Sequence, residues 1–131
     1  MEKEIREMMK AVDCESSCVW MKEGDVMYPY IFLGPASRKM EGMELPSNQG
    51  LCGYCITHDK EIISNDLEHD VRWNTLIDDQ TGYHTHNIIC LPLTLYDEVY
   101  GCIELINKKD GFCSKDVCAC RGIADYILKS L

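Results

Sequence analysis

Two long apolar runs in the last third of the chain, residues 85–95 and 98–107, constrain the fold more than any other feature. Both runs contain several β-branched residues, which are enriched in strands, and only Tyr96 and Asp97 separate them. A two-residue connection between strand-like runs is typical of a tight hairpin. The sequence therefore predicts an antiparallel sheet built around residues 85–107.

A second hairpin is predicted in the first third of the chain. Residues 18–21 and 26–33 are strand-like and flank a charged turn that contains Gly24. Because the run 26–33 is apolar at both even and odd positions, we expect it to be covered on both faces of the sheet. The segments between the hairpins are predicted as a loop at 35–42, short strands at 43–45 and 61–64, and a long polar connection with short helices at 65–82.

Three helices complete the predicted elements. Residues 2–12 carry apolar side chains at helical spacing. A second helix is expected to begin near Ser47 or Asn48, since both residue types cap helices. The last helix is expected from Ser114 to the end of the chain, and its apolar residues follow the 3,4 spacing of a heptad seam. These seam residues are Val117, Cys120, Ala124, Ile127 and Leu131.

Composition narrows the possible functions. The 131 residues fit one domain, expected over 1–131, of the antiparallel α+β class. Lys and Arg number 13 against 22 Asp and Glu, and the resulting net charge of -9 repels polyanions, so neither a nucleic acid nor a membrane is expected as a partner. The longest uncharged apolar stretch, 26–33, is far shorter than the roughly 20 residues that span a bilayer, and no signal peptide is predicted. The nine cysteines are odd in number and are expected to be mostly reduced in a cytoplasmic protein.

Glu104 stands out because it lies inside the apolar run 101–106. A carboxylate on a mainly apolar strand face is either half exposed or lines a cavity where it binds a ligand, since an unpaired buried charge is costly. The usual distribution of glutamate favours the exposed position, and the cavity position remains the alternative.

The segment 49–53 is expected at the start of the second helix, where free N–H groups could hold an anion such as a phosphate. Cys52 in this segment forms a single CxxC motif with Cys55, and His58 follows three residues after Cys55. Such a group could be a redox pair or half of a zinc site, but a structural zinc site needs four ligands and no second CxxC exists. We therefore expect these cysteines to fill the core as small apolar residues, without a bound metal.

Four segments in this order, 48–53, 65–66, 81–93 and 101–108, resemble the motifs of a GAF domain. The resemblance extends over residues 11–131, nearly the whole chain. It implies an α+β fold with a central antiparallel sheet, the terminal helices on one face and a ligand pocket on the other.

Within this family the chain most resembles the regulatory domains of cyclic-nucleotide phosphodiesterases and adenylate cyclases. Their Asn-Lys, Phe and Asp-Glu signature is similar to Asn107-Lys108, Phe112 and Asp116 here, with Val117 in place of the final Glu. The resemblance implies that Lys108 and Asp116 pair and brace the fold near the pocket.

The same resemblance implies a cyclic-nucleotide site. Phe32 corresponds to the aromatic residue that stacks on the purine, and Leu51 and Cys52 to the helix start that faces the phosphate. The further implied pocket residues are Trp73, Thr81, Thr85 and Glu104.

Two positions depart from the pattern of members that prefer guanine, which carry a polar residue and an acid there. This chain has Cys18 and Leu33. The missing acid would have accepted the guanine N–H groups, so its loss argues against cGMP and leaves cAMP, another ligand or none. Between the two cyclic nucleotides we expect cAMP.

Free methionine sulfoxide reductases are a second GAF subgroup, and their G-x-C-G segment resembles the placement of Cys52. They also need a reactive cysteine in the connection that precedes the L-P-L strand, but residues 56–89 contain none. The same absence argues against a bilin-attaching photoreceptor domain. The chain is therefore expected to be regulatory and not an enzyme.

The expected function is that of a sensor module of a larger signalling protein. A cyclic nucleotide would order the 65–82 connection and shift the terminal helices, whose seams would pair in a homodimer and pass the signal to an output domain. Two alternatives remain. One is a thiol-based redox or metal sensor that uses Cys52, Cys55 and His58. The other is a ligand-free dimerisation module, favoured by a pocket filled by Trp73 and Tyr30.

Overall fold

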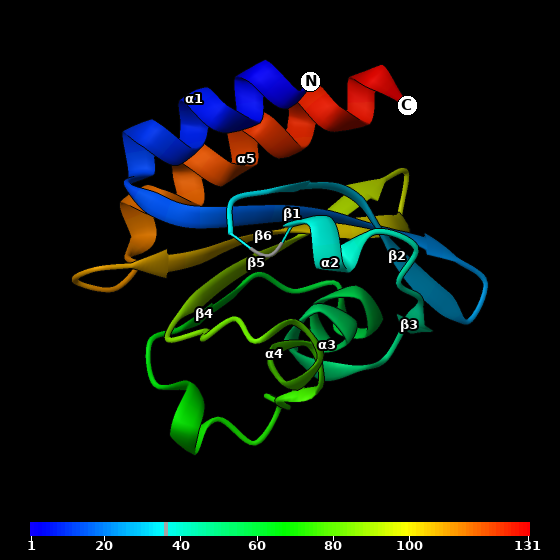
Figure 1. Ribbon diagram of the computed structural model, residues 1–131. Coiled ribbons are helices and arrows are strands. Elements are labelled where there is room, and N and C mark those ends of the chain that lie inside the picture. Colours follow the sequence, from blue (N-terminus) through cyan, green and yellow to red (C-terminus); the bar gives the residue numbers. More distant parts are fainter. Residues whose placement is uncertain (36) are drawn as a thin grey trace.

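Pairing between distant strands organises the chain into one antiparallel sheet. The computed structural model describes residues 1–35 and 37–131. Six strands pair in the order β3-β2-β1-β6-β5-β4, so the two predicted hairpins meet at the β1–β6 pair in the middle (Figure 1). The strands are β1 (Cys14–Glu23), β2 (Val26–Leu33), β3 (Leu45–Pro46), β4 (Ile62–Ser64), β5 (Ile88–Leu95) and β6 (Glu98–Lys108).

The helices form a layer on each face of the sheet, as expected for an α+β domain of this kind. Figure 1 shows the first and last helices side by side over one face, with both chain termini in that layer, and the shorter helices on the other face. They are α1 (Glu2–Val12), α2 (Ser37–Met40), α3 (Gly50–His58), the 3-10 helix η1 (Leu67–His69), α4 (Leu76–Thr81) and α5 (Ser114–Ser130). Within residues 1–35 and 37–131, no helix is long and apolar enough to cross a membrane.

The predicted hairpin at Tyr96 and Asp97 is confirmed. Both residues have positive φ, 52° and 62°, which is the backbone of the turn type whose twist matches that of antiparallel strands. The 65–82 connection also contains the expected short helices, η1 and α4.

Each face of the sheet has its own core because side chains alternate along every strand. On β6, Ile103 and Leu105 point toward α1 and α5, whereas Cys102 and Glu104 belong to the face covered by α3. A single strand therefore contributes to both cores and connects them.

The heptad-like seam of α5 is buried inside the domain. Val117, Cys120, Ala124 and Ile127 belong to the core between α1, α5 and the sheet, and Leu131 lies beyond the end of the helix with 56% of its surface exposed. The prediction that this seam pairs with a second copy is wrong, because its own sheet already covers it. A 17-residue amphipathic helix has the same spacing whether it packs on a sheet or on another helix.

Three local predictions also need correction. The strand β2 is not covered on both faces: Tyr30 is 49% exposed, because β2 lies next to the two-residue edge strand β3, while α1 and α5 pack on β1 and β5. The segment 35–42 contains α2 and is not only a loop; Ala36 lies outside the described residues. The helix α3 begins at Gly50 with Gln49 as its N-cap, and neither Ser47 nor Asn48 caps it.

The predicted brace between Lys108 and Asp116 is confirmed. Lys108 Nζ lies 2.8 Å from Asp116 Oδ1, and the backbone N–H of Cys113 donates to Asp116 Oδ2 at 2.8 Å. Burial by itself raises the pKa of Asp116, but the Lys108 ammonium and the Cys113 N–H outweigh it, so this pKa is lowered. The carboxylate thus joins the end of β6 to the start of α5.

The buried position of the α5 seam predicts that Ile127→Ala destabilises the domain itself. Ile127 has no exposed surface, so its truncation should lower the free energy of unfolding by about 2–5 kcal/mol. The adjacent Tyr126, which is 41% exposed, is the control, and Tyr126→Ala should change this free energy by only about 0.5 kcal/mol. Urea unfolding at two protein concentrations is the measurement. A loss for Ile127→Ala that appears only at the higher concentration would place the seam between two chains instead.

Candidate functional site

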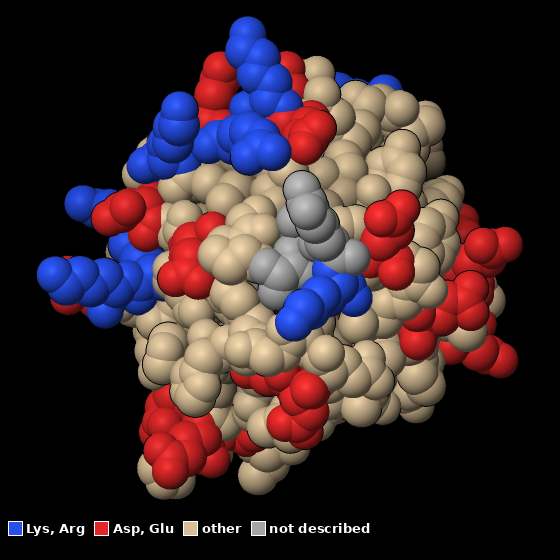
Figure 2. Space-filling model, viewed as in Figure 1, with Lys and Arg blue, Asp and Glu red and all other residues tan. Residues whose placement is uncertain are grey.

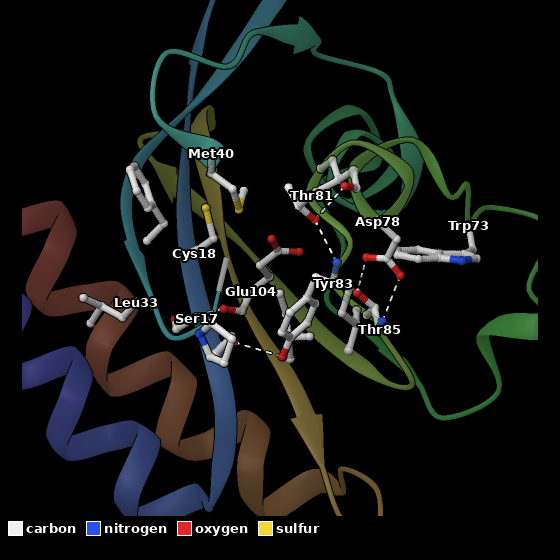
Figure 3. Close-up of a pocket in the computed structure, with 16 residues that line it drawn as sticks. Ser17, Cys18, Leu33, Met40, Trp73, Asp78, Thr81, Tyr83, Thr85 and Glu104 are labelled. Carbon is white, nitrogen blue, oxygen red and sulfur yellow. Dashed lines mark hydrogen bonds between the residues drawn. The ribbon is translucent and has the colours of Figure 1, made fainter. Parts of the chain in front are cut away.

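Two small chambers adjoin each other on the face of the sheet opposite α1 and α5. The first, here called the Thr81 chamber, encloses about 50 Å³ between β1, β2, β6 and α4 (Figure 3). The second, the Gly50 chamber, encloses about 40 Å³ at the start of α3. Each has room for a few water molecules. The residues that line both chambers are Trp73, Ile77, Ile88 and Glu104.

All seven residues of the predicted pocket line one or both chambers. The sequence segments that carry them are up to 72 residues apart (from Phe32 to Glu104), and the fold brings them together. Phe32, Thr81 and Thr85 line the Thr81 chamber, and Leu51 and Cys52 the Gly50 chamber. The two that line both are Trp73 and Glu104.

Glu104 is buried, so the favoured prediction of an exposed carboxylate is wrong and the alternative of a cavity-lining position holds. Only 5% of its surface is exposed, because β6 is central in the sheet and α3 covers this part of it. Figure 3 shows its carboxyl group between Cys18 and Met40 on one side and Thr81 and Tyr83 on the other.

Two donors satisfy the Glu104 carboxyl group. The indole Nε1–H of Trp20 donates to Oε1 at 2.8 Å, and the thiol of Cys52 donates to Oε2 at 3.1 Å. Burial raises the pKa of Glu104, and these two hydrogen bonds oppose that shift without cancelling it. A carboxyl group with these properties at a chamber wall is a candidate for ligand recognition.

Thiols surround Glu104 within the sheet. Cys18 on β1 and Cys90 on β5 are its direct cross-strand partners, so the three side chains form a row on the same face. The Sγ atom of Cys52 lies 3.7 Å from that of Cys90. Burial raises the pKa of Cys18, and for Cys52 a hydrogen bond with Cys102 adds to burial in the same direction. These thiols are therefore core residues whose surroundings in the metal-free chain disfavour the thiolate form.

The CxxC motif does not form a joint site with His58. Cys55 is fully buried, whereas His58 is exposed and stacks on the ring of Tyr54 at a centroid distance of 3.9 Å. His58 is the last residue of α3, and its Nδ1 lies 3.0 Å from the carbonyl oxygen of Tyr54 at the exposed end of the helix, away from the buried thiols.

The start of α3 opens into the Gly50 chamber. Gly50 has a φ of 67°, which only glycine adopts readily, and no side chain caps the first turn. A Cβ on Gly53 would overlap the backbone of Asn48, so glycine is also needed where the helix packs closely against the segment that precedes it. The observed start of α3 therefore falls inside the segment 49–53, in which the sequence predicts an anion-binding position.

Asp70 anchors the 65–82 segment, which carries Trp73 and Ile77 to the chambers. Its carboxylate accepts hydrogen bonds from Ser64 Oγ at 2.7 Å and from Arg72 Nε and Nη2 at 2.9 and 2.6 Å. The Arg72 guanidinium also lies over the ring of Tyr54 on α3, at 5.2 Å from its centroid. These contacts hold the segment that delivers Trp73 to the chambers.

A second carboxylate, Asp78, closes the other end of this segment. It accepts from the Thr85 backbone N–H at 2.8 Å and from Thr85 Oγ1 at 2.7 Å. Tyr83 also lines the Thr81 chamber, and its hydroxyl group hydrogen-bonds Ser16 Oγ at 3.0 Å. Asp78, Tyr83 and Ser16 are not among the predicted site residues, because nothing in their spacing along the chain indicates that they meet.

The chain belongs to the GAF domain family, which it matches over residues 1–131. Stretches of it are similar to two curated relatives: 64 residues are 31% identical to a probable 3',5'-cyclic phosphodiesterase of Caenorhabditis elegans. A further match of 76 residues is 33% identical to a cGMP-specific 3',5'-cyclic phosphodiesterase of Drosophila erecta. The matches cover 49% and 57% of this chain but only 9% and 7% of those relatives.

Solved structures share the fold. The GAF domain of a phosphoenolpyruvate-protein phosphotransferase from Coxiella burnetii superposes with a TM-score of 0.84 at 13% identity, covering 95% of this chain and 76% of that one. A type II free methionine-R-sulfoxide reductase from Thermoplasma acidophilum superposes with a TM-score of 0.74 at 18% identity, covering 98% and 92%. The predicted family and fold are thus confirmed.

The Asp70 anchor predicts that Asp70→Asn lowers the free energy of unfolding by about 2 kcal/mol at pH 7. The hydrogen bonds from Arg72 lower the pKa of Asp70, whose side chain is only 9% exposed. A lowered pKa contributes stability that is present above the ordinary value of 3.8 and is lost progressively as the pH falls from there towards the lowered value, so the difference between the two proteins should begin to narrow below about pH 4.

Urea unfolding between pH 7 and pH 3 tests this expectation. Asp66→Asn is the control, since Asp66 lies on the same segment but its side chain is 69% exposed and hydrogen-bonds only His69. Equal losses for the two variants, or a difference that does not depend on pH, would contradict the role assigned to Asp70.

Proposed function

We propose that this GAF domain is a sensory module that binds a cyclic nucleotide, cAMP in preference to cGMP, in the two chambers. The observation that carries the proposal is the convergence of Phe32, Glu104 and the start of α3 on one connected site. An aromatic face, a buried carboxyl group and a helix N-terminus supply the three contacts that a purine, its N–H groups and a cyclic phosphate need.

Each part of the ligand has a place in this arrangement. The purine stacks on Phe32 in the Thr81 chamber, near Thr81 and Thr85, and the phosphate lies at Leu51 and Cys52 in the Gly50 chamber. Trp73 and Glu104 face both. The apolar Leu33 lines the Thr81 chamber, which supports the preference for adenine over guanine. One relative is cGMP-specific, and this makes the choice of base the first point to test.

Ligand binding requires the chambers to widen. Their present volumes, about 50 and 40 Å³, hold a few water molecules and not a nucleotide. Trp73 and Ile77, which line both chambers, belong to the 65–82 segment, so an outward shift of this segment enlarges both at once. The segment then closes over the ligand, with Asp70 and Asp78 as the anchors at its two ends.

The signal passes through β6 to the terminal helices. Glu104 faces the chambers, while Ile103 and Leu105 on the same strand pack beneath α1 and α5. A shift of β6 on ligand binding therefore changes the packing of both helices. We propose that these helices join two copies in a homodimer through their outer faces, where Leu131 is exposed, and lead to an output domain of a larger protein.

The remaining attributes follow the same proposal. The net charge of -9 supports a cytoplasmic protein with neither nucleic acid nor membrane as partner. Figure 2 shows acidic side chains at the right and bottom of one face and basic side chains at its upper left. In this proposal the domain is regulatory: it catalyses no reaction and therefore needs no catalytic cofactor. Its fold is shared with free methionine-R-sulfoxide reductases, but residues 56–89 lack the cysteine that such an enzyme needs. The pocket of a ligand-free dimerisation module would be filled by Trp73 and Tyr30, but Tyr30 is exposed.

Titration calorimetry of the reduced, metal-free protein with cAMP and with cGMP tests the proposal. We expect saturable binding with the higher affinity for cAMP. Because stacking on an aromatic side chain contributes about 1–3 kcal/mol per base, Phe32→Ala should weaken binding roughly 5- to 150-fold.

Tyr30→Ala is the matched control, since Tyr30 is an aromatic residue two positions away on the same strand and lines neither chamber. It should leave the affinity unchanged. Glu104→Gln, which keeps an acceptor for Trp20, should weaken binding without loss of the fold. No heat with either nucleotide, together with no thermal stabilisation, would reject the cyclic-nucleotide proposal.

A further inference from the structure

A buried group of metal-ligating side chains lies between α3 and the sheet. Among residues 1–35 and 37–131, the ligand atoms of Cys52, Cys90 and Glu104 lie within 4.8 Å of one another, and no other group of three His, Cys, Asp or Glu residues converges in this way. All three residues are buried, with exposed fractions of 7%, 0% and 5%. They come from α3, β5 and β6, so the tertiary fold assembles the group.

The distances within this group fit a tetrahedral zinc site. In such a site Zn–S bonds of about 2.3 Å place two sulfur ligands about 3.8 Å apart. The Sγ atoms of Cys52 and Cys90 are 3.7 Å apart. Cys52 Sγ and Glu104 Oε2 are 3.1 Å apart, a hydrogen-bond distance that widens by a few tenths of an ångström when a metal replaces the thiol proton.

The carboxylate is already oriented for this role. Trp20 Nε1–H holds Glu104 Oε1 at 2.8 Å and leaves Oε2 directed at Cys52. Such an outer hydrogen bond is the usual support for a ligating carboxylate. Cys90 lies directly opposite Glu104 on the adjacent strand, which fixes the spacing of the second pair.

We propose that Cys52, Cys90 and Glu104 bind one Zn²⁺ ion, with a water molecule from the Gly50 chamber as the fourth ligand. That chamber is lined by Cys52 and Glu104 and, at about 40 Å³, accommodates the water. Two thiolates and a carboxylate are ligands that zinc accepts, and the thiolates exclude magnesium and calcium. The ligand set differs from the CxxC motif, since Cys55 and His58 take no part.

Metal binding is balanced by proton release. The thiols of Cys52 and Cys90 each lose one proton to the solvent as their sulfur atoms bind the metal. The two positive charges of Zn²⁺ then offset two of the three negative charges on the ligands. The ion also ties α3 to the sheet at the wall of the Gly50 chamber, where it replaces the weak hydrogen bond between Cys52 and Glu104.

The zinc site and the nucleotide site share Cys52 and Glu104 but are separable by experiment. Cys90 lines neither chamber, so Cys90→Ala removes a metal ligand and leaves the nucleotide contacts in place. Phe32→Ala does the reverse. Failure of cAMP and cGMP to bind therefore does not count against the zinc site.

Titration of the reduced, metal-free protein with Co²⁺ and then Zn²⁺ tests the proposal. Co²⁺ should give a sulfur-to-metal charge-transfer band at one equivalent, which distinguishes this site from histidines and carboxylates on the surface. Zn²⁺ should displace it and raise the Tm. Cys90→Ala should abolish the band and weaken Zn²⁺ binding by more than roughly 100-fold, the upper range for loss of an outer-shell partner.

Cys55→Ala is the matched control, because Cys55 is as deeply buried as Cys90 and lies one turn from Cys52 on α3. It should keep the band. If Cys90→Ala does not fold, Cys90→Ser, which is closer to cysteine in size, replaces it and should also abolish the band. A wild type that gives no band, or a band retained in the Cys90 variant, would overturn the proposal.

Discussion

The pairing of β6 between β1 and β5 is the interaction on which the rest of the structure depends. A strand in the middle of a single-layer sheet presents alternate side chains to opposite faces, and helices cover both faces here. Ile103 and Leu105 therefore belong to the core beneath α1 and α5, and Glu104 to the wall of the chambers. The same register sets Cys18 and Cys90 on either side of Glu104.

Burial of the Glu104 carboxyl group is the main energetic tension in this fold. A carboxyl group removed from water raises the free energy of the charged form, and the hydrogen bonds from Trp20 and Cys52 only partly compensate. A ligand N–H group or a metal ion at Oε2 would relieve this cost, and both proposals use that property. The two ligands would lie on different sides of the carboxyl group: a nucleotide in the chambers, and a metal ion between α3 and β5.

Local chemistry determined most of the secondary structure. The tight hairpin at Tyr96 and Asp97 and the amphipathic stripe of α1 follow from residue type and spacing, and the pairing of Lys108 with Asp116 follows from the resemblance to the family. Errors arose where an element's neighbours decide its environment. The α5 seam could have packed on a second chain, and β2 could have been covered on both faces; the position of each relative to the sheet settled the outcome.

The sequence by itself determined the family, most of the elements and seven of the residues around the chambers, because motifs and periodicities are local or inherited from relatives. Only the tertiary structure decided that Glu104 is buried, that Cys52 meets Cys90 and not His58, and that Asp70 and Asp78 anchor the segment over the chambers. These contacts join residues on different strands and helices. Their distances depend on strand register and helix placement, which spacing along the chain does not specify.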